Sequence, residues 1–145
     1  MSSIQEVDHG QLSSIALAIF DSQPFTKMIG AKLEKVGPGE AHIKLGNRPD
    51  LQQQHGFVHG GVVGYLADNA LTFAGGLALG GDAVTAEYKI NYLRPATGEY
   101  IVARATTIST TKTQAVCQCL VYSFDGTVEK VVAAAQGTIV KAHQG

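Results

Sequence analysis

The chain has 145 residues, and its 11 Lys and Arg side chains nearly balance 12 Asp and Glu. This length fits one domain, which we expect over residues 1–145 with an N-terminal helical segment over 1–24, and 45% hydrophobic residues exclude intrinsic disorder. A net charge of −1 offers no basic stripe for nucleic acid, while only 16% charged residues leave apolar surface that favours a homo-oligomer.

Residues 1–10 carry no Lys or Arg, and no apolar run of signal-peptide length follows them, so we expect a cytoplasmic protein. Apolar residues then recur at three- and four-residue steps, as on one face of a helix, at Leu12, Ile15, Ala16 and Ile19. We predict a short amphipathic helix over residues 11–20.

The next segments have the pattern of a β-hairpin. Residues 30–37 and 39–46 read as strands, and Gly37-Pro38-Gly39 predicts the turn between them. A loop over residues 47–58 follows.

Residues 60–81 are long, apolar and rich in small side chains, which predicts a helix buried against closely approaching backbone. A membrane span of this length is disfavoured, because Asp68 and Asn69 near its middle are costly in lipid. We expect Gly75 and Gly76 to loosen its last turns.

Strand patterns fill the rest of the chain, over residues 84–93, 100–108, 115–124 and 128–140. Four consecutive strands predict an antiparallel meander and an α+β domain. In the first strand, regular alternation places Val84, Ala86 and Tyr88 on one face and Thr85 on the other. Cys117 and Cys119 lie on one face of one strand, and we expect buried, reduced thiols rather than a metal site.

Asp68 is the only formally charged side chain between Asp50 and Asp82. An Asp inside a helix commonly faces solvent or bonds to a neighbour, but this one is surrounded by apolar residues. Poor solvation disfavours the charged carboxylate and moves its pKa toward the range of a general base. Asp68 is therefore a candidate base or nucleophile.

His59-Gly60-Gly61 lies directly before the long helix, where backbone N–H groups are unpaired. Such a terminus is either an ordinary glycine-rich helix start or an oxyanion hole for acyl transfer. Gly60 and Asp68 are eight residues apart, about 12 Å along a helix. If both act on one carbonyl they must come from different chains, which predicts a dimer with antiparallel helices.

The run His55-Gly56-Phe57-Val58-His59-Gly60-Gly61, with Asp68 nine residues after His59, resembles the hotdog-fold acyl-CoA thioesterases. The resemblance covers roughly residues 25–141, includes Thr85 and the strand end at Arg94-Pro95, and is nearest to the phenylacetic-acid-pathway subgroup. It implies a long helix wrapped by a curved antiparallel sheet, with active sites shared between two protomers, usually within a tetramer.

Carried over by position, the resemblance makes Asp68 the base or nucleophile. It implies that the Gly60 amide polarises the thioester carbonyl and that Thr85 positions water. Gln53 stands where some relatives have Asn, so Gln53 or His55 assists at the carbonyl. His59 is either an acid–base group or a helix-start residue bonded to backbone. Further candidates for substrate contact are Gly61, Tyr65, Asn69 and Arg94. Of these, Arg94 could bind a coenzyme A phosphate.

We therefore expect hydrolysis of an aryl- or medium-chain acyl-CoA without a metal or other cofactor, since coenzyme A is part of the substrate. Two alternatives stay open: a hotdog hydratase or dehydratase acting on acyl thioesters, and a non-catalytic acyl-CoA binding protein. The sequence contains neither a Gly-x-Ser-x-Gly elbow nor a phosphate-binding loop.

Overall fold

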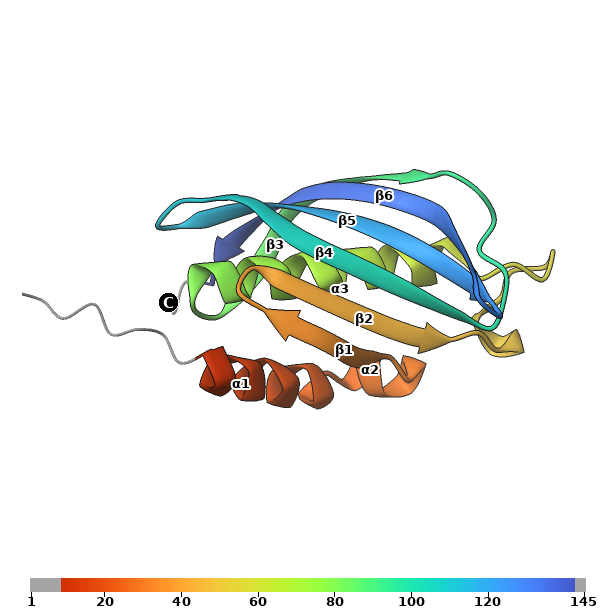
Figure 1. Ribbon diagram of the computed structural model, residues 1–145, viewed down its shortest axis with the longest axis horizontal. Coiled ribbons are helices and arrows are strands. Elements are labelled where there is room, and N and C mark those ends of the chain that lie inside the picture. The colour runs from red at the N-terminus through yellow and green to blue at the C-terminus, as the bar shows by residue number, and fades with distance from the viewer. Residues whose placement is uncertain (1–8, 143–145) are drawn as a thin grey trace, which may run out of the picture.

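The computed structural model describes residues 9–142, so the predicted segment over 1–24 is described only from His9 onward. A six-stranded antiparallel sheet arches over one long helix, and two short helices lie below its first strand (Figure 1). The elements are α1 (His9–Ser22), α2 (Pro24–Ile29), β1 (Lys32–Gly37), β2 (Glu40–Gly46), the 3-10 turn η1 (Pro49–Leu51), α3 (Gly60–Leu79), β3 (Ala83–Tyr92), β4 (Tyr100–Thr110), β5 (Gln114–Asp125) and β6 (Val128–Lys141). The predicted α+β hotdog arrangement, a central helix wrapped by an open antiparallel sheet, is confirmed.

Helix α3 forms the centre of the core. By length and composition it is apolar enough to cross a membrane, but more than half of it is buried inside the fold, as in the core helix of a soluble protein. The expected loosening at Gly75 and Gly76 is wrong, because the helix continues to Leu79 and ends at Gly80 in the left-handed conformation. A Cβ at Gly75 would lie 2.6 Å from Ile139 Cβ, so this glycine lets β6 approach the helix.

The strand order is β1-β2-β4-β5-β6-β3, so the predicted four-strand meander is wrong for its first strand. Only β4, β5 and β6 form a meander. Helix α3 carries the chain beneath the sheet to its far edge, where β3 pairs with β6. The connection after β3 then returns the chain to β4, beside β2. Strand β3 is thereby left at an edge of the sheet.

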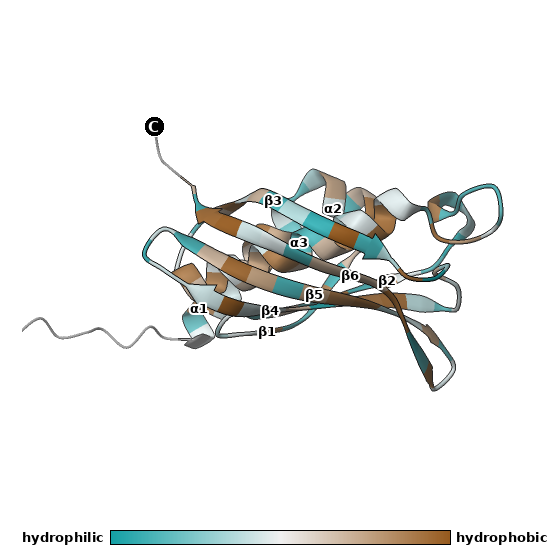
Figure 2. Cartoon of the chain, turned by 90° about the horizontal axis from the view of Figure 1, so that it is seen from above, coloured by the Kyte–Doolittle hydropathy of each residue, from teal (hydrophilic) through white to brown (hydrophobic). Residues whose placement is uncertain are grey.

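A β-bulge between Thr85 and Glu87 changes which side chains of β3 face the helix. Hydrophilic and hydrophobic residues alternate along this strand (Figure 2). The extra residue at the bulge changes which member of each alternating pair faces α3. Thr85 therefore faces inward with Tyr88, whereas Val84 is 51% exposed. The predicted alternation is wrong at this end of the strand, because Thr85 shares the inner face with Tyr88, whereas Val84 and Ala86 do not.

Helix α1 is longer than predicted, and its apolar face is only partly covered. Ala16 and Phe20 are buried, with the Phe20 ring 5.5 Å from that of Phe73 in an edge contact. Ile15 and Ile19 remain 47% and 43% exposed. Helix α2 was not expected from the sequence; Pro24 starts it, where a missing N–H costs nothing, and Gly30 ends it.

The two cysteines lie buried and unpaired on β5, as predicted. Burial raises the pKa of the Cys119 thiol to about 12, and it also raises that of Cys117. Both side chains therefore remain neutral thiols at physiological pH. Across residues 9–142, no three His, Cys, Asp or Glu side chains gather closely enough to hold a metal ion.

Gly137 of β6 controls how closely β3 lies against its neighbour. A Cβ there would come within 2.6 Å of both the Glu87 carbonyl oxygen and Tyr88 Cβ. We expect Gly137→Ala to lower the free energy of unfolding by about 1–3 kcal/mol, measured by urea denaturation, because backbone must move. Gly46→Ala is the control, since nothing lies within 4 Å of its Cβ position. Equal midpoints for the two variants would contradict this account.

Candidate functional site

Asp68 lies in a cluster of three polar side chains between α3 and β3. Thr85 Oγ1 donates a hydrogen bond to Asp68 Oδ1 at 2.6 Å, and Thr72 Oγ1 lies 2.7 Å from Thr85 Oγ1. Thr72 also donates to the Asp68 carbonyl oxygen at 2.8 Å. The bulge in β3 makes this cluster, because it turns Thr85 toward the helix.

The Asp68 carboxylate is half-buried, and one of its two oxygens is still available. Within residues 9–142, no donor is bonded to Oδ2. Burial raises the pKa of the nearby Tyr88 phenol, and the Asp68 carboxylate adds to this rise. Tyr88 therefore stays protonated at neutral pH.

A second group of predicted residues surrounds the N-terminus of α3. His59 is the N-cap, and its Nδ1 accepts a hydrogen bond of 2.8 Å from the Gly61 N–H. The imidazole thus serves the helix start, and the Gly61 amide is already bonded. The Gly60 N–H has no acceptor among the residues that the structure describes, which leaves a first-turn donor for a ligand.

A hollow of about 320 Å³ brings Gly60 together with Gln53 and Arg94. The Gln53 side chain accepts a hydrogen bond from the backbone N–H of His55, which shapes the loop. The His55 side chain is exposed, 6.3 Å from the Phe57 ring, and does not line the hollow. Arg94 is also exposed, at the rim, where a charged ligand has access.

Two tyrosines of β3 cover α3 between these groups, which sequence reasoning did not assign to the site. Tyr92 Oη donates to the Gly60 carbonyl oxygen at 3.0 Å. A Cβ at Gly64 would lie 3.2 Å from Tyr92 Oη and 3.5 Å from Tyr88 Oη. The sequence signal for this contact was the matched spacing of Gly60 and Gly64 on the helix and of Tyr88 and Tyr92 on the strand, each pair four residues apart.

Tyr65 and Asn69 point instead toward the short helices. Asn69 Nδ2 donates to Gln23 Oε1 at 3.0 Å and to Tyr65 Oη at 3.1 Å, and Tyr65 Oη also bonds to Thr26. Burial raises the pKa of the Tyr65 phenol. These two candidates join α3 to the chain around Gln23 and lie apart from the Gly60 hollow.

The structure thus gathers the candidates into two groups on one unbroken helix. Gly60 and Asp68 both belong to α3, and a rise of about 1.5 Å per residue separates them by about 12 Å along its axis. One carbonyl group therefore does not reach both within a single chain.

A model of the thioesterase superfamily matches residues 55–130, which include Gly60 and Asp68. The chain belongs to the thioesterase superfamily. A thioesterase family protein from Silicibacter pomeroyi is 29% identical, with a TM-score of 0.85 over 89% of this chain and 96% of that chain. A variant of the phenylacetic acid degradation protein PaaI from Thermus thermophilus is 30% identical, with a TM-score of 0.72 over 83% and 100%.

The Escherichia coli PaaI protein of the phenylacetic acid degradation operon has the same fold at 22% identity, with a TM-score of 0.82 over 93% of this chain and 96% of that chain. No functionally curated protein matches the sequence. Membership of the thioesterase superfamily and the neighbours at 29% and 30% identity support a thioester hydrolase that acts on a small molecule.

Proposed function

We propose that the protein hydrolyses an acyl-CoA thioester to a carboxylate and free coenzyme A. The observation that carries the proposal is the Asp68 carboxylate, held at Oδ1 by Thr85 at 2.6 Å, with Oδ2 unbonded among the described residues. A carboxylate fixed at one oxygen presents the other in a defined direction to water or to a carbonyl carbon.

In the proposed reaction, Asp68 takes a proton from water as the water oxygen attacks the thioester carbonyl carbon, or it attacks that carbon itself. The negative charge on the carbonyl oxygen is stabilised by the Gly60 N–H at the helix N-terminus. Collapse of this intermediate breaks the carbon–sulfur bond, and the proton held by Asp68 passes to the sulfur, so that coenzyme A leaves as the thiol. After direct attack, coenzyme A leaves as the thiolate, and water then hydrolyses the anhydride formed between the acyl group and Asp68. No other cofactor takes part in the proposed reaction.

The Gly60 N–H that acts with a given Asp68 comes from a partner chain, because Gly60 and Asp68 of one α3 lie too far apart. Strand β3 offers the contact: it is an edge strand, and Val84, Tyr92 and Leu93 are 51%, 56% and 53% exposed. An unpaired apolar edge pairs readily with a second copy. The proposed site then joins Asp68 of one protomer to the partner subunit's Gly60, in a dimer or a dimer of dimers.

Release of free thiol from aromatic and straight-chain acyl-CoAs tests the activity. We propose an aryl or medium-chain acyl group, with Arg94 placed for a coenzyme A phosphate. Release from at least one thioester supports the proposal, and release from none overturns it. In the latter case, hydration of an enoyl-CoA or binding of acyl-CoA without turnover would identify which alternative holds.

Oligomeric state is a separate prediction. We expect sedimentation equilibrium at micromolar concentration to show twice the 15.2 kDa chain mass, or four times that mass. A charged residue at the β3 edge, as in Val84→Lys, should shift the equilibrium toward the monomer because it interrupts the apolar contact. Leu120→Lys, at an exposed position on β5, is the control. A single species of one chain mass would contradict the shared site.

A further inference from the structure

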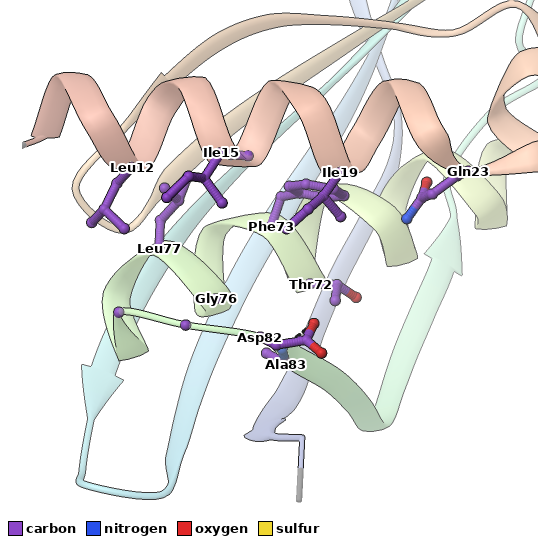
Figure 3. Close-up of a pocket in the computed structure, with 13 residues that line it drawn as sticks. Leu12, Ile15, Ile19, Gln23, Thr72, Phe73, Gly76, Leu77, Asp82 and Ala83 are labelled. Carbon is purple, nitrogen blue, oxygen red and sulfur yellow. Dashed lines mark hydrogen bonds between the residues drawn. The ribbon is translucent and has the colours of Figure 1, made fainter. Parts of the chain in front are cut away.

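A cavity of about 230 Å³ lies between α1 and the C-terminal half of α3 (Figure 3). Leu12, Ile15 and Ile19 point into it from α1, and Phe73 and Leu77 face them from α3. Its lining is mainly apolar. The family match over residues 55–130 does not include α1.

One residue connects this cavity to the Asp68 cluster. Thr72 lines the cavity, and its Oγ1 lies 2.7 Å from Thr85 Oγ1 and bonds to the Asp68 carbonyl oxygen. Thr72 is four residues, about 6 Å, beyond Asp68 along the helix. The apolar walls of the cavity therefore begin within about one helical turn of Asp68.

The side chains also account for the cavity being open. Gly76 forms part of its floor, where a Cβ would approach the Gly81 carbonyl oxygen to 3.2 Å. Gln23 also lines the cavity, and its Oε1 accepts a hydrogen bond from Asn69 Nδ2 at 3.0 Å. Ile15 and Ile19 are 47% and 43% exposed, so a ligand can reach both side chains.

We infer that this cavity binds the acyl group of the substrate, so that α1 sets the acyl-length preference. The inference rests on the proposed function and locates its substrate class. A volume of about 230 Å³ is below the range of about 300–1,000 Å³ for drug-sized ligands, and it suits one aromatic ring or a medium alkyl chain. Long acyl groups exceed it.

Filling the cavity tests the inference. We expect Ile19→Trp to lower the ratio of kcat/KM for octanoyl-CoA to that for acetyl-CoA by about tenfold or more, because the larger acyl group loses its space. Ile15→Trp repeats the test one turn away if the first variant folds poorly. Leu17→Trp is the matched control, since Leu17 is 46% exposed on the same helix but does not line the cavity. An unchanged ratio in Ile19→Trp and Ile15→Trp overturns the inference.

A binding measurement separates this inference from the proposed function. In the Asp68→Asn background, we expect Ile19→Trp to weaken calorimetric binding of octanoyl-CoA by about tenfold and to leave binding of free coenzyme A unchanged. That result without any thioester hydrolysis by the unmodified protein would retain the acyl site and overturn the proposed activity. Hydrolysis by the unmodified protein, together with equal octanoyl-CoA affinity in Asp68→Asn with and without Ile19→Trp, would retain the proposed activity and overturn the acyl site.

Discussion

Asp68→Asn is expected to lower kcat for thioester hydrolysis by about a hundredfold or more, the effect of removing a general base. Asparagine keeps the volume of the side chain and an oxygen that accepts from Thr85, but its amide takes no proton from water. The measurement is free-thiol release at saturating acyl-CoA. The fold should be retained, because Asp68 is only half-buried and forms no ion pair with any described residue.

Asp125→Asn provides the control for this substitution. It also removes one carboxylate, but from the exposed Asp125-Gly126 hairpin turn, where Asn-Gly is equally favoured. We expect its kcat to equal that of the unmodified protein. Undiminished turnover in Asp68→Asn would retain thioester hydrolysis and remove Asp68 from its mechanism. If Asp68→Asn abolishes turnover, single-turnover hydrolysis by the unmodified protein in oxygen-18 water separates base from nucleophile, since direct attack first leaves the label in Asp68.

Gly60→Pro is expected to lower kcat by about a hundredfold to a thousandfold, the effect of losing one oxyanion donor. Gly60 is the first helical residue, where proline is favoured, and His59 before it has φ −57° and ψ 136°, which proline permits. The substitution therefore removes the N–H without disturbing the helix start. The assay is thiol release, with circular dichroism to verify the helix content.

Gly60→Ala is the matched control, because it retains the N–H and its Cβ would lie 3.6 Å from the Tyr92 ring, an ordinary contact. Equal losses in the two variants would show that the shape of the hollow matters rather than the donor.

Mixing Asp68→Asn with Gly60→Pro protomers extends the test to the shared site. Random pairing leaves one complete site in each mixed dimer, so about a quarter of the activity should return. No recovery would place both groups in one chain.

Asp68, the proposed base, was conspicuous because of contrast within the sequence. Asp68 is the only charged residue in a long apolar segment, and His59-Gly60-Gly61 marks the start of the same helix. Both signals lie within one short segment, and the rise per residue of a helix gives the distance between them. The argument for two chains needed only the rise per residue, and the structure supports its premise with an unbroken α3.

The position of β3 was not predictable in the same way. Strand order depends on which edge the chain reaches after crossing beneath the sheet, and alternation within the strand carries no information about that. The cavity beside α1 was hidden for a related reason. Ile15 and Ile19 fit the pattern of a buried stripe, and their exposure depends on how α1 packs against α3, where Phe20 contacts Phe73.

The bulge in β3 also determines how this strand tolerates mutation. Ala86 is exposed, and ordinary substitutions there meet solvent rather than the core. Its deletion is a different event, because regular alternation would return and Thr85 and Tyr88 would no longer face α3 together. Length is therefore more constrained than side-chain identity at this position, and a homologue lacking one residue here would have to support its carboxylate from another strand.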